Sequence, residues 1–255
     1  MIVFPIAKIN LGLYVTEKRP DGYHNLETVF FPVTSVKDVL EAVPAAGDTS
    51  QIHLSGLPVS GNLEENLVWK AYQLLRNRLP QKVPLLDWHL HKAIPMGAGL
   101  GGGSSDGTQA LLMLNEMCGL ELPEKDLLEL ALSLGSDCPF FVYGKPCFAA
   151  GRGEQLAPLE LSLEGYRVEI FPSDIHVSTG KAFGMLSPRP APFDLRKLPQ
   201  IPVTEWRNII GNDFEGSVFA MHPELAAAKS AIYEKGAVYA QMSGSGSALF
   251  GIFKA

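Results

Sequence analysis

The sequence predicts a mixed α and β protein of two domains, and three observations support this fold class. Segments with the helical spacing of apolar residues occur among segments in which apolar and polar residues alternate. The chain has 255 residues, 46% hydrophobic and 19% charged, which is ordinary for a soluble globular protein. The polar stretch AAGRGEQL at 149–156 separates two apolar segments. We therefore expect domains of residues 1–150 and 151–255.

The chain is expected to open with two strands. Apolar and polar residues alternate through residues 8–15, so a strand there buries one set and places Lys8 and Asn10 together on the other face. The turn RPDG at 19–22 then reverses the chain into a second, aromatic-rich strand over 23–33.

A helix and a third strand are expected next. Residues 64–79 have the helical period, and residues 85–94 alternate Trp88 and Leu90 with His89 and His91. The two histidines have the spacing of a metal-binding strand edge, but no cysteine or carboxylate completes a site. A solvent-facing strand is the better interpretation.

Further helices and strands follow the central glycine-rich loop. Ser104 or Ser105 can cap a helix that reaches Cys118, and a second helix runs from Pro123 to Gly135. The remaining expectations are short strand or turn segments at 136–144 and 147–153, a strand at 166–171, an irregular proline-rich stretch at 186–203, a helix at 223–235, and strands at 237–243 and 248–253.

The loop PMGAGLGGGSSDG at 95–107 carries the strongest chemical signal, because glycine amides before a helix can hold a phosphate. It lacks the lysine of a P-loop. It matches the dinucleotide pattern G-x-G-x-x-G, but a helix follows where that fold needs a strand. It also matches the nucleophile elbow G-x-S-x-G around Ser105, although too many loop residues precede that serine for a tight elbow.

Charge and composition exclude some classes of protein. A net charge of −6 and a pI of about 5.5 argue against a broad nucleic-acid surface. Three cysteines without C-x-x-C spacing favour neither disulfides nor zinc. The amino-terminal stretch is too short and too broken for a signal peptide or membrane span, so we expect a cytoplasmic protein without a membrane partner.

A few side chains could carry chemistry, although each has an ordinary structural explanation. Asp137 follows a helix stop beside an apolar run, as a catalytic carboxylate or a capping aspartate would. Lys8 could contact a ligand or be a solvated surface lysine. Tyr23 and Phe183 could stack on a base or belong to the core.

Three segments together resemble the motifs of the GHMP small-molecule kinases: AKINLGLYV at 7–15, PMGAGLGGGSSDG at 95–107 and SGSGSALFG at 243–251. RPDGYHNLETVF at 19–30 and LGSDCPFF at 134–141 resemble the branch of that family that acts on a cytidine-diphosphate-linked sugar alcohol. The match runs in order along nearly the whole chain.

The resemblance implies a fold and a function. The fold would be an α+β kinase with an amino-terminal nucleotide domain like that of ribosomal protein S5 and a carboxy-terminal ferredoxin-like α/β sandwich. The 1–150 domain would bind ATP and carry catalysis, and the 151–255 domain would bind substrate. The activity would be phosphorylation, with ATP and magnesium, of the 2-hydroxyl of the methylerythritol moiety in the non-mevalonate route to isoprenoid precursors. The protein would be a monomer or weak homodimer.

The same resemblance assigns residues. Asp137 would be the catalytic base with Lys8 its neighbour. Asn10 would place the substrate, Tyr23 and Phe183 would sandwich the cytidine ring, and His24 would hydrogen-bond its edge. The residues expected to bind ATP are Asn66, Lys92, Pro95, Gly97, Gly99, Gly101, Gly102, Gly103, Ser104 and Ser105. The magnesium ligands stay unassigned, with Ser105 a candidate by its place in the motif.

Other functions remain open at this point. The chain could be another kinase of the same family that uses a small alcohol without cytidine. It could be a serine hydrolase with Ser105 as nucleophile, served by Asp137 or Asp213 and by His176 or His222 in the required order. It could also bind nucleotide without catalysis.

Overall fold

A computed structural model describes residues 1–255 and divides them into two compact units. The first unit comprises residues 1–7, 36–96 and 101–144, and the second comprises 8–35, 97–100 and 145–255. This division differs from a single boundary after residue 150, because the segments 8–35, 97–100 and 145–150 group with the carboxy-terminal residues.

The first unit is built on a four-stranded sheet of order β1-β4-β6-β5. Its strands are β1 (Ile2–Val3), β4 (Val39–Pro44), β5 (Ile52–Gly56) and β6 (Leu86–Lys92). The β4–β6 pair is antiparallel, whereas β5 and β6 run parallel. A 3-10 turn (Leu63–Glu65) precedes α1 (Leu67–Arg78), and α2 (Gly102–Met117), α3 (Glu124–Leu134) and α4 (Cys138–Tyr143) follow the sheet.

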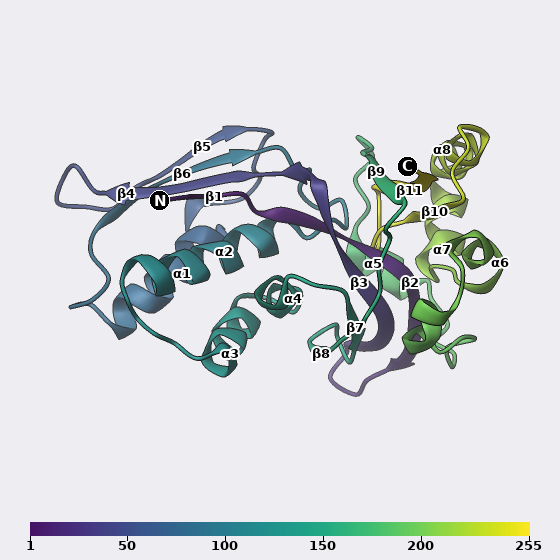
Figure 1. The fold of residues 1–255 in the computed structure, drawn as a ribbon, viewed down its shortest axis with the longest axis horizontal. Coiled ribbons are helices and arrows are strands. Elements are labelled where there is room, and N and C mark those ends of the chain that lie inside the picture. The colour runs from purple at the N-terminus through teal and green to yellow at the C-terminus, as the bar shows by residue number, and fades with distance from the viewer. The chain divides into compact units, whose positions relative to one another are not determined.

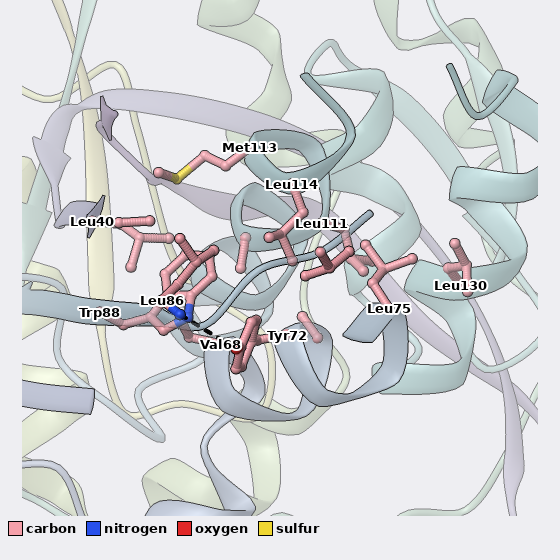
Figure 2. Close-up of a cluster of buried hydrophobic side chains, with 14 of the residues drawn as sticks. Leu40, Val68, Tyr72, Leu75, Leu86, Trp88, Leu111, Met113, Leu114 and Leu130 are labelled. Carbon is pink, nitrogen blue, oxygen red and sulfur yellow. Dashed lines mark hydrogen bonds between the residues drawn. The ribbon is translucent and has the colours of Figure 1, made fainter. Parts of the chain in front are cut away.

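The core of this unit lies between the sheet and its helices (Figure 1). As the alternation predicts, Trp88 and Leu90 of β6 are buried, while His89 and His91 are exposed. In Figure 2, Trp88 lies beside Tyr72 of α1, and their ring centroids are 5.8 Å apart. Burying these large rings supplies much of the hydrophobic stabilisation that fixes α1 on the sheet.

The second unit contains two sheets. The sheet of order β2-β3-β7-β8 is formed by β2 (Ile6–Lys18), β3 (His24–Lys37), β7 (Cys147–Ala150) and β8 (Gln155–Pro158). The antiparallel sheet of order β10-β11-β9 is formed by β9 (Tyr166–Phe171), β10 (Tyr239–Met242) and β11 (Leu249–Lys254). Its helices are α5 (Thr179–Gly184), α6 (Trp206–Ile209), α7 (Phe214–Met221) and α8 (Pro223–Glu234).

The irregular part of this unit contains two short 3-10 helices, Leu195–Gln200 and Val203–Glu205. The first of them includes Pro199, which fits the expectation that the proline-rich stretch forms no regular α-helix. A second hydrophobic core includes Phe214, Leu225 and Ile232 from α7 and α8 and Leu249 from β11. None of the helices has the length and apolar content needed to span a membrane.

Three local predictions were wrong. The segment after α3 was expected to be strand or turn but forms α4, for which Pro139 near the start is a suitable residue. The glycine-loop helix begins at Gly102, before Ser104 and Ser105, so neither serine is its N-cap. Both faces of β2 are buried around residues 8–15, because its polar side chains are enclosed in a hydrogen-bond network rather than facing solvent.

Candidate active site

The first turn of α2 presents free backbone amides in the first unit. Gly101 precedes the helix with φ of 70°, and Ser105 N donates the first intrahelical hydrogen bond to Gly101 O at 2.9 Å. The amides of Gly102, Gly103 and Ser104 therefore have no acceptor within the helix. Because a helix amino terminus carries positive partial charge, this turn can bind a phosphate. A Cβ on Gly103 would meet no atom within 4 Å, so the space beside this residue is open.

A buried ion triad supports this turn from the core side. Lys92 Nζ donates to Asp38 Oδ2 and, at 2.6 Å, to Asp106 Oδ2, and the three side chains are at most 3% exposed. Asp38 Oδ1 also accepts the amides of Ala93 and Ile94 at 2.6 and 2.8 Å. Burial raises the pKa of Asp106 to about 7, against the opposing effect of Lys92. The triad fixes the chain on both sides of the loop.

This arrangement gives Lys92 a supporting role. Its ammonium is directed at two carboxylates inside the unit, and Pro95 follows the strand end that Asp38 anchors through the amide of Ile94. A direct contact of Lys92 or Pro95 with nucleotide stays a prediction.

Asn66 stands beside the same helix. Its Oδ1 accepts from Val68 N at 2.9 Å and so caps α1, while its amide nitrogen has no hydrogen-bond partner. Gly107 allows α1 and α2 to approach, because a Cβ there would lie 2.7 Å from Leu67 Cβ. The start of α1 thereby packs against the early turns of α2, and Asn66 keeps a free donor there.

Asp137 is half-buried at the start of α4, in the same unit as the amide turn. The next residue, Cys138, is held to α2 by a hydrogen bond from Thr108 Oγ1 to its carbonyl oxygen at 3.0 Å. The Cys138 thiol also lies against the side chains of Ser104 and Thr108. These contacts hold the segment that carries the Asp137 carboxylate against the glycine-loop helix.

Ser105 does not have the environment of a nucleophile. It is 0% exposed within α2, and its hydroxyl has no hydrogen-bond partner, histidine and carboxylate included. A catalytic serine needs a base within hydrogen-bond reach and a path for the substrate. The serine-hydrolase alternative is therefore not supported. No group of three His, Cys, Asp or Glu side chains in the structure could hold a metal ion.

In the second unit, Lys8 and Asn10 share one face of β2, as predicted, but they are buried rather than solvated. They are 4% and 2% exposed. Lys8 Nζ donates to Asn10 Oδ1 at 2.8 Å and lies 4.9 Å from the centroid of the Phe30 ring. Asn10 Nδ2 donates to Thr28 Oγ1 at 3.0 Å. Burial of a lysine and an asparagine in one network is unusual for a purely structural strand.

Residues of all three motifs meet within this unit, the central loop contributing residues 97–100. Lys8 N donates to Leu100 O at 2.9 Å, and Ser243 Oγ donates to Gly99 O at 2.7 Å. Gly97 and Gly99 have φ of 66° and 80°, which favours glycine. A Cβ on Gly99 would lie 2.0 Å from Ser243 O, so the loop and the third motif touch backbone to backbone.

Asn212 also belongs to this arrangement, although nothing in the sequence singled it out. Its Nδ2 donates to Met242 O and Gly244 O, both at 2.8 Å, and its Oδ1 accepts from Phe214 N at 2.9 Å. The residue is 6% exposed and fixes the carbonyl groups that flank Ser243. The two carbonyl groups that it binds lie 30 and 32 positions away, so local patterns could not reveal this role.

The aromatic residues expected to bind the cytosine make contacts with other side chains of this unit. Phe183 stacks on His24 with ring centroids 4.8 Å apart and an interplanar angle of 20°, and it meets Phe214 edge-on. The stacking of Tyr23 and Phe183 on the two faces of a base stays a prediction. Tyr23 is 56% exposed, with the Arg152 guanidinium 5.1 Å from its ring centroid. Tyr23 is therefore the more exposed ring, and Phe183 is partly buried with His24 against one of its faces.

Comparison with known proteins decides the family. The profile of the GHMP kinases N terminal domain matches residues 66–145, and that of the GHMP kinases C terminal domain matches residues 196–255. A relative from Bacteroides fragilis named 4-diphosphocytidyl-2-C-methyl-D-erythritol kinase is 49% identical, over 99% of this chain and 92% of the relative. A relative of the same name from Parabacteroides distasonis is 47% identical, over 100% of this chain and 92% of the relative.

The chain belongs to the GHMP kinase family. The crystal structure of a 4-(cytidine 5'-diphospho)-2C-methyl-D-erythritol kinase superposes on this GHMP kinase with a TM-score of 0.82 and 35% identity, covering 98% of this chain and 89% of the other. The predicted two-domain α+β kinase fold is thereby confirmed. The protein is an ATP-dependent small-molecule kinase, as the sequence motifs predict.

Proposed function

We propose that this GHMP kinase transfers the terminal phosphoryl group of ATP to the 2-hydroxyl of 4-diphosphocytidyl-2-C-methyl-D-erythritol, in the non-mevalonate route to isoprenoid precursors. The observation that carries the proposal is the similarity, along the whole chain, to kinases of that name. The RPDGYHNLETVF segment supports the same substrate, because it holds the exposed Tyr23 and the adjoining His24.

The proposed roles follow the properties of the residues. The amides of Gly102, Gly103 and Ser104 bind the ATP phosphates. Gly97 and Gly99, which have positive φ, are further residues that we assign to ATP binding. Asn66 hydrogen-bonds the adenosine through its free amide nitrogen. ATP binding then depends on backbone amides and one neutral side chain. It needs no cluster of basic residues, in agreement with the net charge of −6.

For the transfer itself, Asp137 accepts the proton of the substrate hydroxyl. Phosphoryl transfer proceeds through a loose, in-line transition state in which positioning and charge stabilisation matter more than the strength of the base. Lys8 supplies a positive charge toward the negative charge that develops, and Asn10 helps to place the substrate. Tyr23 and Phe183 stack on the two faces of the cytosine, and His24, which lies against Phe183, hydrogen-bonds the base edge.

We propose that magnesium accompanies the ATP. Mg²⁺ in such enzymes is bound largely by the substrate phosphates and only one or two carboxylates. The residues present do not form a metal cluster, and Ser105, the candidate suggested by the motif, has a fully buried hydroxyl. We therefore assign no residue to the ion and derive no step from it. We further propose a cytoplasmic monomer or weak homodimer, without nucleic-acid or membrane partners.

The test is a panel of acceptor alcohols assayed for ADP release with ATP and magnesium. The proposal predicts turnover with 4-diphosphocytidyl-2-C-methyl-D-erythritol that exceeds turnover with mevalonate and homoserine by orders of magnitude. Preference for an alcohol without cytidine would favour another small-molecule kinase of the family. ATP binding without product from any acceptor would favour a nucleotide-binding protein.

A further inference from the structure

Thr28 of β3 makes two hydrogen bonds from a position that is 0% exposed. Its Oγ1 lies 2.5 Å from Gly12 O and 3.0 Å from Asn10 Nδ2. A hydroxyl has one proton to donate, and a backbone carbonyl can only accept. The proton of Thr28 is therefore committed to Gly12 O, and Oγ1 can serve Asn10 only as an acceptor.

This assignment fixes the orientation of the Asn10 amide. The amide nitrogen must face Thr28, because only the nitrogen can donate to Oγ1. The amide oxygen then faces the opposite way, where it accepts from Lys8 Nζ at 2.8 Å. If the Asn10 amide were flipped, its nitrogen would direct N–H donors at the Lys8 ammonium. Its oxygen would then face Thr28 Oγ1 with no proton between the two oxygen atoms.

Burial makes this orientation matter. Lys8, Asn10 and Thr28 are at most 4% exposed, so water has little access to replace a lost hydrogen bond among them. We propose that Thr28 is a positioning residue, which sets the orientation of the Asn10 amide and through it the position of the Lys8 ammonium. The inference rests on the proposed function, in which Lys8 and Asn10 act on the substrate and its transferring phosphoryl group.

The test compares two substitutions at position 28. Thr28→Val keeps the shape but removes both hydrogen bonds, whereas Thr28→Ser keeps the hydroxyl. Thr34→Val, at an exposed position of the same strand, controls for the change of residue type in a strand. Each variant is assayed for kcat and for the KM of ATP, per mole of folded protein as measured by circular dichroism.

We expect Thr28→Val to lower kcat by about 10- to 100-fold, since small displacements of reacting groups have effects of that size. The KM of ATP should stay within about twofold of the parent protein, because the nucleotide contacts are assigned to other residues. Thr28→Ser and Thr34→Val should retain most of the activity. If Thr28→Val does not fold, Thr28→Cys, whose thiol is a weak hydrogen-bonding group, takes its place with the same expected loss.

Lys8→Met distinguishes a failure of the inference about Thr28 from a failure of the proposed function. If Lys8→Met loses turnover while Thr28→Val keeps the parental kcat, the positioning role is wrong and the proposed function stands. If Lys8→Met itself keeps the parental kcat, the proposed function of Lys8 is wrong, and the role of Thr28 falls with it. A loss in Thr28→Val that appears only as less folded protein, with unchanged kcat, also overturns the inference.

Discussion

Gly99→Ala tests how closely the glycine loop and the third motif must approach. The added Cβ would lie 2.0 Å from Ser243 O, whereas ordinary contacts begin at 3.4 Å, so the two segments must separate by about 1.4 Å. That shift breaks the 2.7 Å hydrogen bond from Ser243 Oγ to Gly99 O, at a cost of about 0.5–1.5 kcal/mol. The left-handed backbone at φ of 80° adds about 1–2 kcal/mol for a residue with a Cβ.

Gly97→Ala is the matched control. Its φ of 66° imposes the same backbone cost, but its Cβ would meet no atom within 4 Å. We therefore expect Gly99→Ala to lose about 1.5–3.5 kcal/mol of unfolding free energy and Gly97→Ala about 1–2 kcal/mol, measured by urea denaturation. The KM of ATP should rise more in Gly99→Ala, because the neighbouring loop amides are displaced. Equal losses in the two variants would refute the reasoning from backbone contact.

Two further predictions concern the first unit. Asn66→Ala should lose about 1 kcal/mol of stability with the helix cap and raise the KM of ATP, whereas Asn66→Asp should keep the cap and still raise the KM, because it lacks the amide donor. An unchanged KM in Asn66→Asp would remove Asn66 from the adenosine site. Asp106 has a pKa of about 7 in the folded protein against 3.8 in the unfolded chain. Between pH 3.8 and pH 7 the folded protein therefore holds a proton that the unfolded chain has lost. The contribution of Asp106 to stability therefore falls as pH rises through that window. Asp106→Asn cannot titrate, and its unfolding free energy relative to the parent should rise from pH 4 to pH 7. A pH-independent difference in urea denaturation would contradict the raised pKa.

Much of the fold follows from local patterns, and the exceptions have physical causes. The alternation in β6 predicts burial correctly, because helices cover only one face of that sheet. In β2 the same pattern fails, since its polar face is enclosed by partners from distant parts of the chain. The helix α4 has six residues, too few to show a helical period, although Asp137 followed by Pro139 was an available signal of a helix start.

Some parts of the candidate site could likewise be predicted from local patterns, and others could not. The glycine loop could be predicted because its amide chemistry depends on neighbouring residues alone. The support of the loop by Asp38, and of the third motif by Asn212, could not be predicted, since each joins groups far apart in sequence. The stacking of Phe183 on His24 likewise depends on packing that no local pattern records.

The most direct measurement of the central claim, that Asp137 accepts the proton of the substrate hydroxyl beside amides that hold ATP, is the turnover of Asp137→Asn. The account predicts a kcat lowered by about 10²–10⁴-fold, the range that acid–base groups provide, with ATP affinity within a few-fold of the parent protein. A kcat within twofold of the parent, at full occupancy of both substrates, would contradict it.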